Sequence, residues 1–368
     1  MRRPDTADTP ATTGAAATAG TPATAGAAAS GETAGSADTL RTRRRRTPPA
    51  VLRRAARALR RPDPWRRGPV FAALALLLGL LMALHARIPG GAKNAGSLVE
   101  TFLPWFGLFV LPLLAGALWR RSAAAAVALV LPVTVWLSLF GGLLTDKSRP
   151  GSDLTVAGHN VGAANPDPAG TARDLAASGA DLLALQEITP AAKPLYEAEL
   201  AKTYPYHTVR GTVGLWSRLP LSDTRPVDVM MQPPRALRAT VATERGPLAV
   251  YVAHLGSVRV NPRAGMSTAQ RDGGAQALAA AVAAEPNERV VVLGDLNGTV
   301  DDRAFDGLTG QVRSVQEEAG NGFGFTWPAG FPVARIDQIL VRGVEPRSAW
   351  LLPATDSDHL PVAAGLAW

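Results

Sequence analysis

Acidic, amide and imidazole side chains recur beside short apolar runs in the C-terminal part of the chain. The side chains that could take part in catalysis or metal binding are Asn160, Glu187, His254, Asp295, Asn297, Asp337, Asp358 and His359. The chain has no cysteine, so thiolate ligands and disulfides are excluded. Hard oxygen ligands suit Mg²⁺, with Mn²⁺ and Ca²⁺ as alternatives, and a Mg²⁺ site commonly combines one or two carboxylates with a substrate phosphate.

Each of these side chains also has an ordinary structural explanation. Glu187 could be a capping or surface acid, and His254 could be a core histidine at a strand end. Asp295 and Asn297 could form an Asx turn. Their joint occurrence beside apolar runs favours a reactive cleft instead.

The elements that must position these side chains are short β-type runs alternating with a few helical stretches. We predict strands at 154–160, 182–186, 213–216, 239–243, 248–253, 290–293, 336–341 and 362–366. We predict helices at 170–178, 191–202 and 267–284. This pattern indicates one mixed α/β domain over residues 147–368.

Ordered motifs in this domain resemble the endonuclease/exonuclease/phosphatase superfamily. The motifs are Asn160, Leu185-Gln186-Glu187, Gly214 to Pro220, Ala253-His254-Leu255, Gly294-Asp295-Leu296-Asn297, Arg335-Ile336-Asp337 and Ser357 to Val362. The resemblance covers residues 153–368. It implies a four-layer α/β/β/α sandwich and divalent-metal hydrolysis of a phosphate ester.

The resemblance also implies roles for the individual residues. Metal binding falls to Asn160, Glu187 and Asp358. Catalysis falls to His254, Asp295, Asn297, Asp337 and His359. Among these, Asp295 would orient or deprotonate the attacking water, and Asn297 would hold a phosphoryl oxygen.

Two histidines carry further implications. His359 and Asp337 match the paired histidine and acid of the superfamily, and such an acid raises the pKa of the imidazole. His254 matches the histidine of the deoxyribonuclease and sphingomyelinase-like branches. Gly162 stands where the abasic-site repair branch has an acidic residue, which argues against a DNA-repair endonuclease.

The net charge of +8 is divided unevenly along the chain. Residues 1–147 hold 19 Lys and Arg against 7 Asp and Glu, whereas residues 148–368 hold 19 against 23. Twelve arginines lie between Arg41 and Arg67. The high sequence pI therefore does not make the C-terminal domain a polycation of the kind that binds nucleic acid nonspecifically.

Three apolar stretches follow the arginines, at about 69–86, 102–119 and 123–144. Each approaches the roughly 20 residues that cross the hydrocarbon layer as a helix. We predict an all-α transmembrane segment over residues 68–146, after a segment, 1–67, that combines a disordered tail with the arginine-rich flank. A buried helical hairpin and a cleaved signal peptide are the alternatives.

The positive-inside rule orients these predicted spans. The arginines before the first span place the N-terminus in the cytoplasm, and Arg120-Arg121 follow the second span. Three crossings then place the C-terminal domain outside a cell membrane. The lipid bilayer is thus a predicted partner. The sequence does not indicate an oligomeric state.

Three hypotheses of function remain open. The first is an exported nuclease-like phosphodiesterase, the second a phosphatase or a phospholipase-like or sphingomyelinase-like enzyme on phospholipid or phosphoinositide headgroups, and the third an inactive binding member. Arg259 and Arg263 are predicted to contact a phosphate substrate. They belong to an arginine cluster around His254 that also contains Arg235, Arg238 and Arg271.

Overall fold

The computed structural model describes residues 62–88, 95–261 and 265–368. The predicted disordered tail and most of the arginine-rich flank lie outside these ranges, as does Arg263. The apolar helices and the α/β domain belong to one compact unit within Arg54–Trp368.

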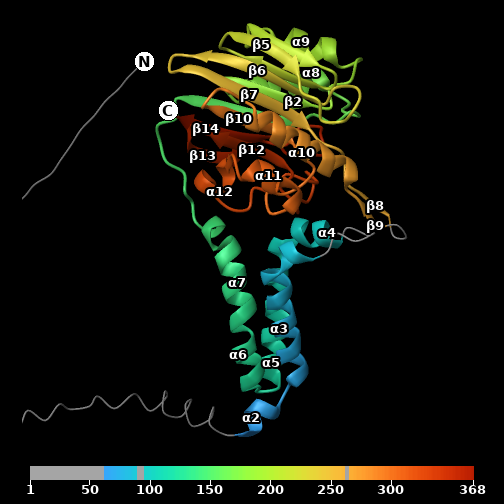
Figure 1. Cartoon of the computed structure of the whole chain (residues 1–368), viewed down its shortest axis with the longest axis vertical. Helices are drawn as coiled ribbons and strands as arrows, with labels where there is room; N and C mark the ends of the chain where they lie inside the picture. The colour runs from blue at the N-terminus through green and yellow to red at the C-terminus, as the bar shows by residue number, and fades with distance from the viewer. Residues whose placement is uncertain (1–61, 89–94, 262–264) are drawn as a thin grey trace, which may run out of the picture. The chain divides into compact units, whose positions relative to one another are not determined.

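Two six-stranded mixed sheets form the C-terminal domain (Figure 1). The first sheet has the order β13 (Glu345–Leu351), β14 (Val362–Ala367), β1 (Leu154–Asn160), β2 (Leu182–Gln186), β4 (Val213–Ser217), β3 (Tyr206–Arg210). The second has the order β11 (Arg313–Ser314), β12 (Asp337–Arg342), β10 (Val290–Asp295), β7 (Gly246–His254), β6 (Ala236–Thr243), β5 (Leu221–Pro226). A separate hairpin pairs β8 (Arg259–Asn261) with β9 (Gly265–Ser267).

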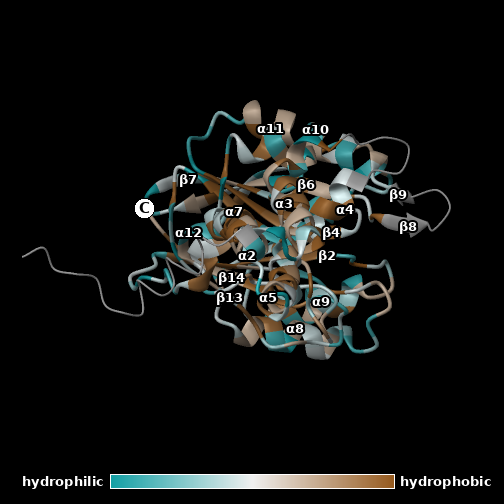
Figure 2. Cartoon of the chain, turned by 90° about the horizontal axis from the view of Figure 1, so that it is seen from below, coloured by the Kyte–Doolittle hydropathy of each residue, from teal (hydrophilic) through white to brown (hydrophobic). Residues whose placement is uncertain are grey.

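Parallel pairing occurs at the centre of each sheet, between β1 and β2 and between β7 and β10. These central strands are almost fully buried, as expected for strands covered on both faces. The apolar side chains of the two sheets pack against each other in one core cluster. In Figure 2 the brown, hydrophobic colour lies on strands inside the domain and on the apolar helices, which this view from below shows end-on.

Helices cover the outer face of each sheet. Helices α8 (Pro168–Ala177) and α9 (Lys193–Leu200) pack on the first sheet around Leu175 and Tyr196. Helices α10 (Ala269–Ala283) and α11 (Asp306–Thr309) pack on the second. The remaining helical elements of the domain are η4 (Arg303–Phe305) and α12 (Val315–Ala319). The predicted α/β class, with two sheets between helical layers, is confirmed.

The apolar region contains shorter helices than the sequence predicts. Its elements are α2 (Pro62–Arg66), α3 (Pro69–Ala83), η1 (His85–Arg87), α4 (Ala95–Thr101), η2 (Leu103–Phe109), α5 (Val110–Trp119), α6 (Ala123–Ala128), α7 (Val130–Phe140) and η3 (Gly141–Leu144). Among the described residues, one continuous helical stretch, Ala123–Leu144, is long and apolar enough to cross a membrane. Pro69–Ala83 and Leu103–Trp119 are apolar but shorter. The structure thus supports one candidate span where the sequence predicts three.

A buried ion pair connects the second sheet to the end of α10. Arg238 Nε and Nη2 donate to the two carboxylate oxygens of Glu285 at 2.9 Å each, and the Tyr251 hydroxyl donates to Glu285 Oε2 at 2.8 Å. Burial alone would raise the pKa of Glu285, but the hydrogen bonds from Arg238 and Tyr251 lower it to about 2. The pair therefore stays ionised inside the protein.

Glu285→Gln should destabilise the protein at neutral pH by about 3–5 kcal/mol, because it removes the buried partner of the Arg238 guanidinium and leaves only the exposed Asp223 carboxylate as its counter-charge. That cost corresponds to a fall in Tm of roughly 6–20 °C for a domain of this size. Because the folded-state pKa is depressed, the stabilisation is present above pH 4.5 and is lost as the pH falls towards 2.

Thermal unfolding between pH 7 and pH 2.5 measures this effect, with the exposed Glu288→Gln as the matched control. The variant curve should be flatter than that of the wild type over the acid range. Parallel curves for wild type and Glu285→Gln would contradict the assignment.

Candidate active site

The polar site begins with side chains that share one end of the second sheet. In the strand register, Asp295 pairs with His254 on β7 and with Asp337 on β12. Three adjacent strands therefore carry an imidazole and two carboxylates side by side. On the first sheet, Asn160 ends β1 opposite Gln186 on β2, so that Glu187 follows directly.

Asn160 joins the two sheets at this point. Its Nδ2 donates to Asp295 Oδ2 at 2.9 Å and lies 3.5 Å from His359 Nε2. His359 Nε2 also lies 3.8 Å from Asp295 Oδ2. The ends of β1 and β10 and the segment before β14 thus meet in one buried centre.

His359 is paired with Asp337. Its Nδ1 lies 2.8 Å from Asp337 Oδ2, which fixes the orientation of the ring and leaves Nε2 facing Asn160 and Asp295. Burial lowers the pKa of His359, but the hydrogen bond and charge of Asp337 outweigh it and raise the pKa to about 9. The imidazole is therefore cationic near neutral pH and can form an ion pair with an anionic group.

His254, in contrast to His359, is neutral. Burial and the nearby Arg235 guanidinium lower the pKa of His254 to about 4, so its ring is neutral near pH 7. Arg235 Nη1 lies 3.5 Å from His254 Nδ1. On the other side, His254 Nε2 lies 3.6 Å from Glu187 Oε1 and 3.7 Å from Asp295 Oδ2.

Asp295 is oriented by two donors in addition to the imidazoles. The backbone N–H of Asn297 donates to Asp295 Oδ1 at 2.9 Å, and the Asn297 side-chain amide donates to Asp295 Oδ2 at 3.3 Å. Burial and the negative charge of Asp337 raise the pKa of Asp295 to about 7. A carboxylate with such a pKa accepts a proton readily at neutral pH.

Two residues of the centre have left-handed backbone conformations. Glu187 has φ of 63° and Asn297 has φ of 52°. Asparagine tolerates this region, but for glutamate it costs free energy. The conformation of Glu187 lets its Oε2 accept the Ala163 N–H at 2.8 Å, directly beside the site.

The donor set fits a hard divalent cation. Among the described residues, Asp295, Asp337 and His359 each offer a ligand atom within 4.8 Å of one another. Asp337 Oδ1 and His254 Nε2 are buried and form no hydrogen bond in the structure. The short Asp337–His359 contact engages His359 Nδ1, so Asp337 Oδ1 and the side-chain oxygens of Asp295 are the oxygen atoms that this group offers to a cation.

The structure brings together seven of the predicted residues: Asn160, Glu187, His254, Asp295, Asn297, Asp337 and His359. Asp358 lies at the rim instead. It is exposed, and its Oδ2 accepts the Trp327 indole N–H at 3.3 Å. Its negative charge still contributes to the raised pKa of His359.

The predicted arginine cluster divides into separate parts. Arg238 is buried against Glu285, and Arg271 is buried in an ion pair with Asp302 at 2.8 Å. These two guanidinium groups support the fold and cannot form an exposed phosphate-guiding rim. Arg259 lies on β8, and Arg263 lies outside the described residues, so their predicted substrate contacts stay predictions.

Three further residues contact the centre or its rim, although the sequence analysis assigns none of them an individual role. Arg235 contacts His254, Trp327 contacts Asp358, and the Ser357 hydroxyl donates to Asn160 O at 2.6 Å. Ser357 Oγ also accepts the His359 N–H at 3.1 Å. Ser357 belongs to a motif and Arg235 to the arginine cluster, whereas Trp327 carries no distinguishing signal.

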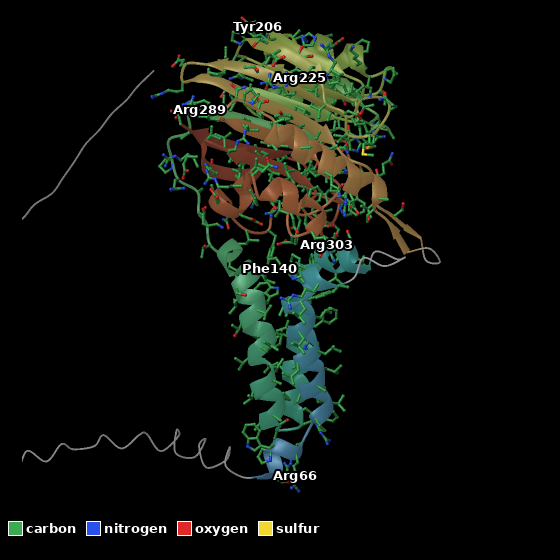
Figure 3. All side chains as sticks on the ribbon, in the orientation of Figure 1. Arg66, Phe140, Tyr206, Arg225, Arg289 and Arg303 are labelled. Atoms are coloured by element: carbon green, nitrogen blue, oxygen red, sulfur yellow. The ribbon has the colours of Figure 1, made fainter. Side chains whose placement is uncertain are left out.

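Helix α4 reaches the loop that follows β10. Ser97 Oγ donates to Asp302 Oδ2 at 2.6 Å, and Arg271 Nη1 donates to Ser97 Oγ at 3.2 Å. Arg271 Nη1 also donates to the backbone oxygen of Asn297 at 3.4 Å. Arg303, labelled in Figure 3, forms an ion pair with the fully buried Glu100 at 2.9 Å. The segment before the domain thus supports the loop that carries Asn297.

Comparison with solved structures shows the fold. The D. rerio TDP2 complexed with a single-strand DNA product is 21% identical, with a TM-score of 0.50, and covers 58% of this chain and 99% of its own. A humanized D. rerio TDP2 is 20% identical with the same TM-score and coverage. Sphingomyelinase C from Streptomyces griseocarneus is 20% identical, with a TM-score of 0.45, and covers 59% and 99%.

Comparison of the sequence with curated proteins and with family models gives two results. No curated protein matches the chain. The model of the Endonuclease/Exonuclease/phosphatase family matches residues 157–359, a range that begins within β1 and ends at His359. Since this range is more than half of the chain, the protein belongs to the endonuclease/exonuclease/phosphatase family.

Proposed function

We propose that the protein is a divalent-metal-dependent phosphodiester hydrolase. The observation that carries this proposal is the meeting of Asn160, Asp295 and the Asp337–His359 pair from both sheets in one buried centre. The family supports the class, because its members are typically phosphoesterase hydrolases. The inactive-member hypothesis is disfavoured, because the carboxylates and imidazoles of the centre are all present.

Bond cleavage in this centre requires a nucleophile, a base and a positive charge. Asp295 accepts a proton from the attacking water, and the Asn297 N–H holds the orientation of that carboxylate. The His359 imidazolium faces the centre through Nε2, where it stabilises the charge on the phosphoryl oxygens. A bound divalent cation, held by Glu187, Asn160 and Asp295, would supply Lewis-acid polarisation of the phosphate. The products are a phosphomonoester and an alcohol.

Metal removal tests the proposal directly. Dialysis of the full-length protein against a chelator should abolish hydrolysis of bis-nitrophenyl phosphate, and Mg²⁺ or Mn²⁺ should restore it. The reason is that chelation would remove the Lewis acid that polarises the phosphate in the proposed mechanism. Release of nitrophenolate measures the rate. Undiminished turnover after chelation would rule the mechanism out.

We also propose that the apolar helices anchor the catalytic domain outside the cytoplasmic membrane. Three spans remain the topology that the arginine distribution favours, although among the residues that the structure describes only Ala123–Leu144 has the full length. Alkaline phosphatase fused after Lys147 should be active, and the same fusion after Arg61 should be inactive. The reverse pattern would exclude this orientation.

Nucleic acid and phospholipid both offer the phosphodiester that such a centre cleaves. The domain from residue 148 onward has four more acidic than basic residues, and two of the arginines near His254 are buried in ion pairs. These charges do not favour a polyanion. An apolar pocket beside the candidate span favours a lipid ester.

A further inference from the structure

An apolar pocket of about 480 Å³ lies between the apolar helices and the segment before β12. Its volume falls within the roughly 300–1,000 Å³ typical of small-molecule sites. Trp105 and Gly107 of η2, Val133 and Trp136 of α7, and Phe323 and Phe325 line it. None of these residues belongs to the catalytic centre.

The polar atoms of the two pocket tryptophans are already engaged. Trp105 Nε1 donates to Val333 O at 2.8 Å, and Trp136 Nε1 donates to Pro104 O at 2.8 Å. Since an indole has one donor and no acceptor, both rings present only their apolar faces to the pocket. Such a lining stabilises hydrocarbon and leaves a charged headgroup without partners.

The pocket is built by a continuous aromatic stack. Trp105 stacks on Phe325 with ring centroids 5.5 Å apart, and Phe325 stacks on Phe323 at 5.2 Å. Phe323 in turn contacts Trp136 and Phe140 at about 6 Å. Rings held in this way form a rigid wall, which reduces the entropy lost when a ligand binds.

The surroundings of the pocket are those of a lipid-exposed surface. Val133, Trp136 and Leu137 belong to the candidate span Ala123–Leu144. Leu108 and Leu111 line the pocket and are more than half exposed. Large exposed apolar side chains around an apolar pocket mark contact with membrane or partner rather than with water.

The pocket wall is adjacent in sequence to residues that contact the catalytic centre and its rim. Phe325 is followed by Thr326, whose Oγ1 accepts the backbone N–H of Asp337 at 3.3 Å. The next residue, Trp327, donates to Asp358. One residue of chain and one hydrogen bond therefore separate the pocket wall from the acid that is paired with His359.

We infer that this pocket binds a hydrocarbon chain of the substrate, so that the substrate is a membrane lipid carrying a phosphate ester. The inference rests on the proposed phosphodiesterase activity. The apolar walls hold the chain, and the segment that follows Phe325 contacts Asp337 and Asp358 beside the catalytic centre. The exposed leucines at the pocket give the chain access from the bilayer.

A homologous series of substrates tests the inference. Alkyl 4-nitrophenyl phosphates from methyl to decyl differ in chain length alone, so the chemistry at phosphorus stays constant. With full-length protein in lipid nanodiscs and Mg²⁺, kcat/KM should rise up to about fourfold for each methylene that enters the pocket. The decyl ester should exceed the methyl ester at least tenfold.

Pocket-filling variants separate binding in the pocket from partition into the bilayer. Leu108→Trp and Val133→Phe each occupy part of the cavity and should lower the decyl-to-methyl ratio of kcat/KM at least fivefold. Leu118→Trp is the matched control, because Leu118 is 68% exposed and Leu108 is 55% exposed, and Leu118 does not line the pocket. The ratio is the readout, since a folding defect lowers the rate for both esters together.

The outcomes distinguish the pocket from the activity on which it rests. A ratio that falls in both filled variants and stays high in Leu118→Trp supports the inference. Wild-type hydrolysis of the methyl ester without any dependence on chain length overturns the pocket and leaves the phosphodiesterase standing. Retention of the wild-type ratio in all three variants overturns the pocket in the same way. No hydrolysis of any ester with metal present overturns both.

Discussion

His359→Gln should lower kcat for phosphodiester hydrolysis by about 10²- to 10⁴-fold, because it removes the cationic imidazole from the centre. Asp337→Asn should have a similar effect, since Asp337 fixes the His359 ring through the 2.8 Å contact and raises its pKa to about 9. The double variant should be little worse than either single variant, as expected for two groups that act as one unit.

Steady-state kinetics with the four proteins of this cycle measure the coupling. His207→Gln provides the control, because His207 stacks on Trp216 at 5.9 Å, outside the site. Effects that multiply in the double variant would show that the two residues act independently, and the pairing would then have no catalytic meaning.

Asp295→Asn should reduce kcat by a similar factor of about 10²–10⁴, because an amide cannot accept the proton of the attacking water. The new amide would also face the Asn160 Nδ2 donor, which now lies 2.9 Å from Asp295 Oδ2. A loss in kcat with a nearly unchanged KM is expected for a group that acts on the transition state.

Two controls accompany the Asp295→Asn experiment. The exposed Asp174→Asn on α8 should retain full activity. Thermal unfolding should show that Asp295→Asn remains folded, because neutralising a carboxyl whose pKa is raised by burial removes a buried charge. Retention of more than a tenth of the wild-type kcat would remove Asp295 from the role of base.

The central strands could be predicted because burial on both faces leaves near-continuous apolar runs. All eight predicted strands correspond to observed strands, among them β1 and β2 with the same bounds. The predictions missed the edge strands β3, β5, β11 and β13 and the hairpin of β8 and β9. In β3 and β5 the side chains are mostly exposed and polar, as in Tyr206-His207 and Asp223 to Arg225, and thus lack the hydrophobic periodicity that identifies a strand.

The composition of the site could be predicted, but its pairwise geometry could not. Motif order identified Asn160 and Asp295, whereas their hydrogen bond depends on the packing of one sheet on the other. Burial is likewise invisible in sequence. Arg238 and Arg271 therefore counted as members of a surface cluster although the structure buries both in ion pairs.

The apolar region shows a related difference. Composition alone predicts three long spans, but helical geometry interrupts two of them. Helix α3 ends at Ala83, and the second stretch begins as a 3₁₀-helix with Pro104 near its start. Proline fixes the backbone and removes a hydrogen-bond donor, so an apolar run containing it need not form one uniform α-helix.

The contacts between α4 and the loop after β10 limit how this protein can be divided. A secreted fragment lacking the helices would leave Asp302 and Arg303 without Ser97 and Glu100. Arg271, which also donates to the Asn297 carbonyl, would then lose its hydrogen bond to Ser97 on α4 and be exposed to water there. Replacing the helical segment with an unrelated one would therefore also alter the loop that carries Asn297.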